Sequence, residues 1–199
     1  MKRAPGRAMF TRSPSGGRTP LAVASGVLAR AQRRGVSYAA LDGGLGLDPI
    51  GRLAGEGRIQ GGLRARLAEL QDLGAWCSRN APGLRAANVS SDPYDGGGAS
   101  AVQELAYTIA TGLEYLRQLT ESGMSVDAAA RQIGFSYSVS GDFFTQVAKL
   151  RAARWLWAKV VSTAGGEQSA AAMHTHCRTS RFTKTQRDPW VNMLRVTSE

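Results

Sequence analysis

Strand-like and helix-like segments alternate at a regular spacing over the second half of the chain, and this alternation constrains the fold more than any other feature. Strand patterns at residues 84–89, 132–140 and 172–179 are separated by helix patterns at residues 100–121 and 143–161. Strands joined by helical crossovers run parallel. The sequence therefore predicts an α/β fold with a parallel sheet, either an open doubly wound sheet or a closed (β/α)8 barrel of the TIM type.

Further helices are expected on either side of this region. Apolar residues recur at helical spacing from Leu21 to Arg34, and Gly35 follows as a C-cap. Asp48 precedes Pro49 in the order typical of an N-cap and a first helical residue, which predicts a short helix through Leu53. The remaining expected elements are a helix over residues 63–79, a glycine-rich loop over residues 94–98 and a last helix beginning at Asp188-Pro189.

For the two longest expected helices, the sequence predicts a cap on one and a packing face on the other. We expect Asp142 to cap the helix at residues 143–161. The helix at residues 100–121 is expected to pack through one apolar stripe. That stripe comprises Val102, Leu105, Ile109, Gly112, Leu113 and Leu116.

The strand at residues 132–140 has two faces of different chemistry, because successive side chains of a strand alternate between faces. One face carries Ile133, Phe135, Tyr137 and Val139, whereas the other carries only glutamine, glycine and serine. An open sheet covered by helices on both sides is apolar on both faces, and an ordinary barrel interior is filled by bulky residues. The small polar face therefore indicates either a barrel with its axis occupied by something other than side chains, or an edge strand with one wet face.

The formal charge of +10 is concentrated at the N-terminus. Residues 1–34 hold eight of the 25 basic residues and none of the 15 acidic ones, so the remainder carries 17 basic against 15 acidic residues. Residues 1–20, with three prolines and no hydrophobic period, are expected to form a disordered basic arm. A solvated tail is favoured over nucleic-acid binding, since no nucleic-acid motif follows, and over a transit peptide, since residues 21–34 read as a helix.

Other classes of function find little support. The chain has no apolar stretch of about 20 residues and no secretory signal, so we expect a cytoplasmic protein without a membrane interaction. Cys77 and Cys177 are expected to be ordinary thiols. His174 and His176 share a strand face without a third ligand, so no metal site is predicted. Residues 96–98 are read as a flexible connection because they lack the lysine of a phosphate-binding loop.

Several sequence blocks resemble those of one known family, in the same order and spacing. They are Gly-Ala-Ser-Ala-Val-Gln-Glu-Leu-Ala-Tyr at residues 98–107, Ala-Lys-Leu-Arg-Ala-Ala-Arg-Trp-Leu-Trp-Ala at 148–158 and Asp-Pro-Trp-Val-Asn-Met-Leu-Arg at 188–195, together with residues 43–53. The family is that of the cobalamin-dependent acyl-CoA mutases, and the pattern is most similar to the small, non-catalytic subunit of methylmalonyl-CoA mutase.

This resemblance implies the barrel rather than the open sheet. In the family, the pantetheine arm of the acyl-CoA runs along the barrel axis past small polar side chains. Adenosylcobalamin lies over one barrel end and is held by a separate domain that carries an Asp-x-His-x-x-Gly motif, which this chain lacks. The resemblance thus implies adenosylcobalamin in a complex with a catalytic mutase subunit as partner, and no cobalamin-binding motif in this chain.

Positions that matter in catalytic members carry other residues here. Their Tyr-His pair corresponds to Tyr94-Asp95, their Arg-Leu-Ser-Phe to residues 132–135, and their His-x-Gln to residues 176–178. Asp95, His176 and Arg178 therefore stand at degenerate catalytic positions, and no catalytic residue is assigned with them. The resemblance places acyl-CoA contacts at Tyr94, Gln132, Gly134, Ser136 and Ser138.

The expected organisation is a basic arm at residues 1–20 followed by a partial acyl-CoA mutase barrel domain at residues 21–199, truncated at both ends. We expect this chain to act as a small-subunit-like, non-catalytic partner in the isomerisation of methylmalonyl-CoA and succinyl-CoA. The resemblance implies an isomerase as the whole complex and does not assign that activity to this chain by itself. Two alternatives are a catalytic segment of an acyl-CoA mutase and a nucleic-acid-binding protein that uses the basic arm.

Overall fold

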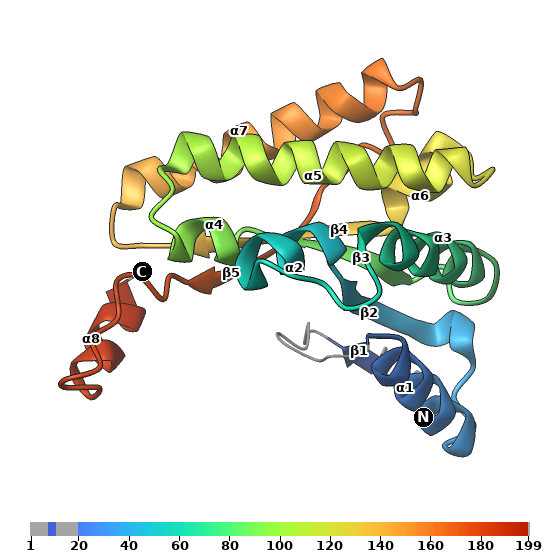
Figure 1. Cartoon of the computed structure of the whole chain (residues 1–199), viewed down its shortest axis with the longest axis horizontal. Coiled ribbons are helices and arrows are strands. Elements are labelled where there is room, and N and C mark those ends of the chain that lie inside the picture. The colour runs from blue at the N-terminus through green and yellow to red at the C-terminus, as the bar shows by residue number, and fades with distance from the viewer. Residues whose placement is uncertain (1–7, 11–19, 199) are drawn as a thin grey trace, which may run out of the picture.

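A computed structural model describes residues 8–10 and 20–198 (Figure 1). Their strands form one sheet in the order β1-β2-β3-β4-β5, and every neighbouring pair is parallel. The sheet curls into part of a barrel, which confirms the predicted partial (β/α)8 fold. The strands are β1 (Ala8–Phe10), β2 (Leu41–Leu47), β3 (Leu84–Ser90), β4 (Ile133–Val139) and β5 (His174–Thr179).

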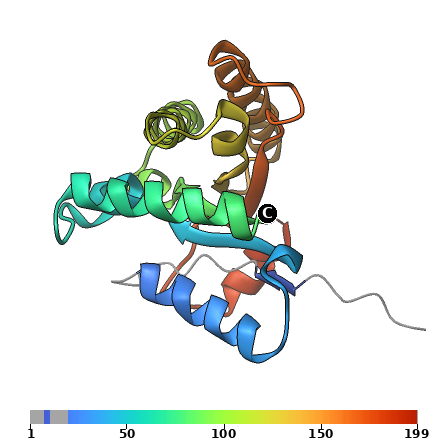
Figure 2. The same ribbon diagram turned by 90° about the vertical axis from the view of Figure 1, so that its right-hand side faces the viewer.

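Helices follow the strands in turn. Figures 1 and 2 show α5 and α7 on one side of the sheet and α1 on the other side, below β2. The helices are α1 (Pro20–Arg33), α2 (Pro49–Glu56), α3 (Leu63–Asn80), α4 (Asp92–Gly96), α5 (Ala101–Glu121), α6 (Val126–Arg131), α7 (Phe143–Thr163) and α8 (Val191–Ser198), with a 3-10 turn η1 (Tyr38–Ala40) before β2.

The strand pattern differs from the prediction at two places near the N-terminus. Ala8–Phe10 forms the short strand β1 beside β2, where residues 1–20 were expected to form a disordered arm, and Pro20 of that arm begins α1. Residues 1–7 and 11–19 of the expected arm lie outside the described residues. A three-residue strand is too short to show a period in the sequence, and it forms here through pairing with β2.

The second unpredicted strand is β2, whose sequence Leu-Asp-Gly-Gly-Leu-Gly-Leu reads as a loop because glycine disfavours strands. Burial alternates along it, with Leu41, Leu45 and Leu47 buried. The glycine at position 83 brings the chain close to β2, because a Cβ atom there would lie 2.3 Å from the Leu41 carbonyl oxygen. Packing and pairing therefore override the local propensity.

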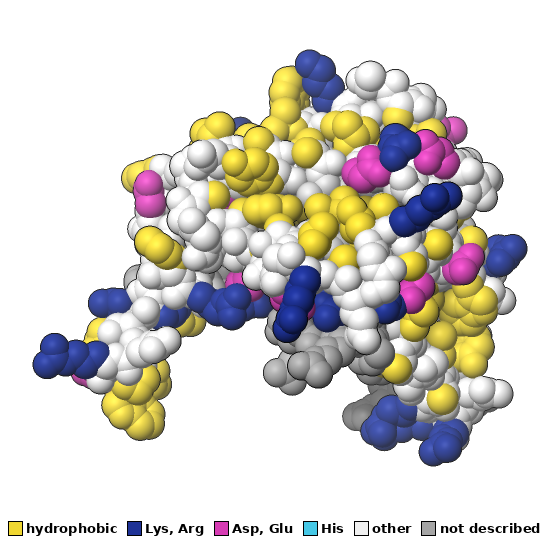
Figure 3. Space-filling view, viewed as in Figure 1, with side chains coloured by type: hydrophobic (Ala, Val, Ile, Leu, Met, Phe, Trp, Pro, Cys, Tyr) yellow, Lys and Arg dark blue, Asp and Glu magenta, His cyan; other side chains and the backbone are white. Residues whose placement is uncertain are grey.

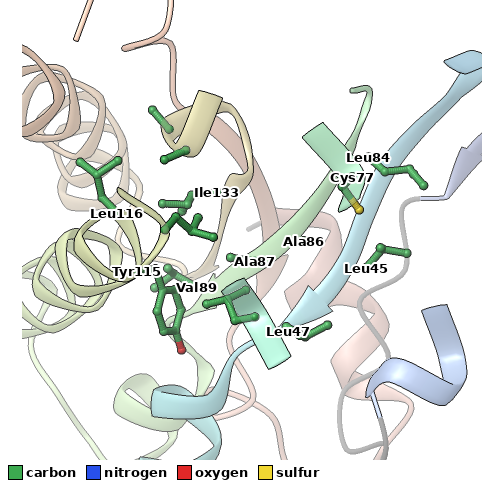
Figure 4. Close-up of a cluster of buried hydrophobic side chains, with 14 of the residues drawn as sticks. Leu45, Leu47, Cys77, Leu84, Ala86, Ala87, Val89, Tyr115, Leu116 and Ile133 are labelled. Carbon is green, nitrogen blue, oxygen red and sulfur yellow. The ribbon is translucent and has the colours of Figure 1, made fainter. Parts of the chain in front are cut away.

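The core lies between the sheet and the helices that cover its outer face. Figure 4 shows side chains from β2, β3, α3 and α5 in one cluster of buried residues. On β4 the apolar face, with Phe135 and Tyr137, turns into this outer layer. Burial of such side chains contributes about 1.5–3 kcal/mol each. The cluster includes Leu45, Leu47, Cys77, Leu84, Val89, Tyr115, Leu116 and Ile133.

Helix α5 packs through a wider face than its predicted apolar stripe. Gly112 and Leu116 of the stripe are buried and Leu105 and Ile109 pack against the core, whereas Val102 and Leu113 are exposed, at 76% and 48%. The buried face also carries Glu104, Thr108, Thr111, Tyr115 and Leu119. Glu104, Thr108 and Tyr115 can lie inward because Lys149 of α7, Tyr137 of β4 and Asp48, which follows β2, are their hydrogen-bond partners.

Several element boundaries also differ from the prediction. The expected loop at residues 94–98 begins inside the single-turn helix α4, and α6 is an additional helix. Asp142 stands at the N-cap of α7 but makes no side-chain capping hydrogen bond. Helix α8 begins at Val191, a few residues after Asp188-Pro189. By contrast, Asp48 caps α2 as predicted, accepting a hydrogen bond from the Gly51 amide.

Candidate functional site

A row of polar and small residues runs across the inner face of the sheet. The strand register aligns Asn88 with Gly134 and His174, and Ser90 with Ser136 and His176. Ser138 is aligned with Arg178 at the C-terminal end of the strands. We call this set the inner row: Asn88, Ser90, Gly134, Ser136, Ser138, His174, His176 and Arg178. Its members on β4 are those that strand alternation predicts for the small polar face.

Gly134 stands at the centre of the inner row and leaves space there. A Cβ atom at this position would meet Arg85 Cδ at 3.5 Å, Asn88 Oδ1 at 3.5 Å and His174 Cδ2 at 3.7 Å, all ordinary contact distances. Asn88 Nδ2 donates to Ser136 Oγ at 3.3 Å. The surroundings of Gly134 are therefore hydrogen-bonding groups and a guanidinium stem, with room for one small substituent.

Electrostatics around this point disfavour the protonated form of His174. Burial lowers the pKa of His174 below its ordinary value of 6.5, and the positive charge of Arg85 lowers it further, against the opposing effect of Asp42. Arg85 itself is paired with Asp42, with an Nη1–Oδ1 distance of 3.4 Å. His176, the retained histidine of the resemblance, is exposed on the edge strand β5.

At the C-terminal rim of the sheet, α4 contacts the end of β5 and the segment that follows it. Asp92 pairs with Arg178 at 3.4 Å and with Arg181. Asp95 Oδ2 accepts a hydrogen bond from Ser180 Oγ at 2.7 Å. We call these five residues the rim latch. Both Asp95 and Arg178, two of the degenerate catalytic positions, are thus engaged by partners within the chain.

Two expected acyl-CoA contacts lie apart from the inner row. The Tyr94 ring packs on Tyr107 of α5 at a centroid distance of 5.1 Å, and its hydroxyl lies 3.3 Å from Thr111 Oγ1. Gln132 is buried before β4, where its Oε1 accepts a hydrogen bond from the Ala86 amide. The structure therefore brings together Gly134, Ser136 and Ser138, with His176 and Arg178, but neither Tyr94 nor Gln132.

Behind the rim lies a buried polar network that sequence reasoning missed. Lys149 Nζ donates to Glu104 Oε2 and to the Ser138 carbonyl oxygen, each at 2.6 Å. The Ser138 amide donates to Ser91 Oγ at 2.8 Å. The sequence gives no local signal for this network, because α5 and α7 each carry several other charged residues. These bonds fix the end of β4 and hence the upper end of the inner row.

A second network of this kind holds the end of β2. Asp48 accepts hydrogen bonds from Tyr115 Oη at 2.6 Å and from the Ser90 amide at 2.8 Å. Burial raises the pKa of Asp48 above its ordinary value, although these hydrogen bonds act in the opposite direction. The carboxylate therefore serves as a structural junction between β2, β3 and α5.

The described residues offer neither a metal cluster nor a fit for cobalamin. No group of three His, Cys, Asp or Glu side chains within residues 8–10 and 20–198 is arranged to hold a metal ion. Both histidines of the chain lie on β5, and neither belongs to an Asp-x-His-x-x-Gly segment. In this part of the chain no helix is long and apolar enough to cross a membrane.

A partial barrel of parallel strands with a small polar inner row is the class of architecture that the fold and the site define. The family model described as methylmalonyl-CoA mutase matches residues 10–199. The chain therefore belongs to the methylmalonyl-CoA mutase family.

Individual relatives agree with this assignment. The chain is 46% identical over 163 residues to the methylmalonyl-CoA mutase small subunit of Streptomyces virginiae, covering 82% of this chain and 26% of that protein. It is 44% identical over 156 residues to the probable small subunit of Mycobacterium tuberculosis H37Rv, covering 77% and 24%. It is 37% identical over 131 residues to the Escherichia coli K12 mutase, covering 65% and 18%. The chain spans about a quarter or less of the length of these relatives.

Proposed function

We propose that this chain works as a non-catalytic, small-subunit-like part of a methylmalonyl-CoA mutase. In this role it assembles with a catalytic subunit that isomerises methylmalonyl-CoA and succinyl-CoA. The similarity to proteins named small subunits supports the proposal. A cytoplasmic location is part of the same proposal.

The observation that carries the non-catalytic role is the rim latch. At the positions where the resemblance expects a histidine and a glutamine for the reaction, the chain has Asp95 and Arg178. Asp95 is bonded to Ser180, and Arg178 is paired with Asp92. Polar groups that steer a reaction must be free to contact the substrate, so groups already bonded to other side chains of the chain are poorly suited to this task.

We further propose that any acyl-CoA contact falls on the inner row at Gly134, Ser136 and Ser138. These residues are small and lie on one face of β4, and Asn88 and His174 supply hydrogen-bonding atoms beside Gly134. Tyr94 and Gln132 are less suited because their polar atoms are bonded to α5 and β3. Adenosylcobalamin, which supplies the radical chemistry in the family, would be held by the partner subunit.

A turnover measurement tests this function. Purified chain is incubated with adenosylcobalamin and methylmalonyl-CoA, and succinyl-CoA is quantified with and without a mutase large subunit. We expect no succinyl-CoA from the chain alone, because the rim residues are engaged and the cobalamin motif is missing. Turnover by the isolated chain would favour the catalytic alternative instead.

A further inference from the structure

Helices α5 and α7 lie side by side above the sheet, and two contacts fix their relative position (Figure 1). Lys149 of α7 pairs with Glu104 of α5 at 2.6 Å. A Cβ atom on Gly112 of α5 would lie 3.1 Å from Trp157 Cζ3 of α7. Both contacts join residues 45 positions apart, so the two helices run parallel and level with each other. Their outer sides therefore form one continuous surface.

The side of α7 that faces away from the sheet is aromatic and basic. Phe144 and Trp155 are exposed, at 82% and 63%, and Arg151 and Lys159 are exposed as well. At about 100° per residue these four positions fall within a sector of about 80°, on the side opposite the buried Trp157. Lys159 Nζ lies 5.3 Å from the centroid of the Trp155 ring. Positive charge and apolar surface are thus combined on one side of the helix.

Helix α5 extends this surface. Val102 and Leu113 are exposed and fall within about 20° of each other around the helix. The opposite flank of α5 contacts α3 and α4 through Gln118 and Tyr107, so Val102 and Leu113 lie on the flank toward α7. Figure 3 shows hydrophobic side chains on the surface over α5 and α7. We call this set the outer patch: Val102, Leu113, Phe144, Arg151, Trp155 and Lys159.

The chemistry of the outer patch is that of a protein interface. A contiguous exposed apolar patch marks an interaction site more often than scattered single residues do. Tryptophan and arginine are enriched among the residues that contribute most of the binding energy of interfaces. The outer patch offers both residue types on a rigid pair of helices.

The charge of the patch specifies what can cover it. Helix α7 has four basic residues and no acidic residue. Lys149 is paired with Glu104, whereas within residues 20–198 no carboxylate forms an ion pair with Arg151 or Lys159. Covering these two cations without a counter-charge would carry a desolvation penalty. A partner that buries the aromatic side chains of the patch must therefore bring carboxylates to the same place.

We propose that the outer patch binds an acidic amphipathic helix of the catalytic mutase subunit, an inference that rests on the function proposed above. The apolar side of that helix packs on Phe144 and Trp155, and its Asp and Glu side chains pair with Arg151 and Lys159. A helix of about 15 residues matches the distance of about 22 Å from Phe144 to Lys159 along α7. A third helix can pack on two neighbouring helices through ridges and grooves of side chains.

An anionic lipid surface is the competing occupant. Sequences that bind such surfaces ordinarily carry clusters of about four to eight Lys and Arg residues. The outer patch carries two cations between apolar side chains. Its charge therefore favours a protein partner with a few matched carboxylates over a lipid surface.

A binding measurement with charge-reversal variants tests the proposal. The dissociation constant of the full chain and a methylmalonyl-CoA mutase large subunit is measured by biolayer interferometry. The double variant Arg151→Glu with Lys159→Glu should raise this constant about tenfold or more, because two attractive contacts become repulsive. Trp155→Ala should raise it about fivefold or more, because it removes a central aromatic contact.

The matched control makes the same change in net charge outside the patch. Arg64→Glu with Arg79→Glu alters two exposed residues of α3 and should change the dissociation constant by less than about twofold. Equal affinities of the patch variant and the α3 control would overturn the inference and leave the proposed function standing. Failure of the unsubstituted chain to bind the large subunit would contradict the proposed function and this inference with it.

Cross-linking identifies what covers the patch. A photoreactive benzophenone side chain placed at position 144 should cross-link to an acidic helical segment of the large subunit, as identified by mass spectrometry of the peptides. A cross-link to a second copy of the chain, or to a segment without an excess of Asp and Glu, would overturn the inference. Co-sedimentation of the chain with phosphatidylcholine–phosphatidylglycerol vesicles that is lost only in the patch variant would assign the patch to lipid instead.

Discussion

Lys149 and Glu104 form a fully buried ion pair that joins α7 to α5, with both side chains 2% exposed. Lys149 also donates to the Ser138 carbonyl oxygen, so the pair fixes β4 at the upper end of the inner row. A buried charge that loses its partner carries a large desolvation penalty, whereas a pair replaced as a whole does not. The position of β4 relative to both helices therefore depends on this contact.

Substitution of one partner is expected to be severe. Lys149→Met leaves the Glu104 carboxylate buried without a partner, and we expect the free energy of unfolding from urea titration to fall by about 3–5 kcal/mol. The double variant Lys149→Met with Glu104→Gln should recover part of this loss. The control is Glu121→Gln, which removes an exposed partner of Arg117. It should change the free energy of unfolding by no more than about 1 kcal/mol. Equal effects at positions 149 and 121 would contradict the structural role.

Gly112 is expected to resist even the smallest substitution. A Cβ atom there would lie 2.8 Å from Phe135 Cζ and 3.1 Å from Trp157 Cζ3. We expect Gly112→Ala to lower the free energy of unfolding by about 1–3 kcal/mol, since the two rings must shift in a packed core. The matched control is Gly26→Ala on α1, where nothing lies within 4 Å, and it should raise stability by up to about 1 kcal/mol. A neutral Gly112→Ala variant would show that α5 packs elsewhere.

Gly134, unlike Gly112, is expected to accept a small side chain. Because its nearest neighbours would lie at 3.5–3.7 Å from a Cβ atom, we expect Gly134→Ser to change the free energy of unfolding by less than about 1 kcal/mol. This substitution restores the serine that the resemblance expects in catalytic members. It should not create turnover, because Asp95 and Arg178 remain in the rim latch. Succinyl-CoA production by this single variant would assign catalysis to the chain.

His174 should make the protein less stable in acid. Its folded-state pKa is lowered below 6.5, so the folded state binds the proton less readily than the unfolded state. Its contribution to stability is therefore complete above pH about 6.5 and declines as the pH falls through this value toward the folded pKa. Proton NMR should give a titration midpoint below 6.5, and Arg85→Gln should raise it. A midpoint at or above 6.5 in the unsubstituted protein would contradict the described surroundings.

The sequence predicts those parts of the fold that depend on local pattern. The periodicity of residues 63–79 and 143–161, the capping signal at Asp48 and the alternation along β4 all correspond to observed elements. For the candidate site, alternation alone places Gly134, Ser136 and Ser138 on one face. These features need no knowledge of distant contacts, so they can be read from short segments.

What the sequence does not reveal depends on contacts between distant segments. Strand β2 forms despite its glycines because β1 and β3 pair with it on either side. Helix α5 turns Glu104 inward because Lys149, 45 positions later, neutralises it. Likewise, the pairing of Asp92 with Arg178 depends on the register of β5 and on the single turn of α4. None of these relationships has a local signature.

Complex formation with a mutase large subunit tests the central claim most directly. The chain and a large subunit are co-expressed, purified through a tag on the large subunit, and examined by size-exclusion chromatography with mass measurement. The account predicts co-elution as a complex that contains both chains and turns over methylmalonyl-CoA, while the chain alone does not. A chain that never co-elutes with the large subunit, yet converts the substrate by itself, would contradict it.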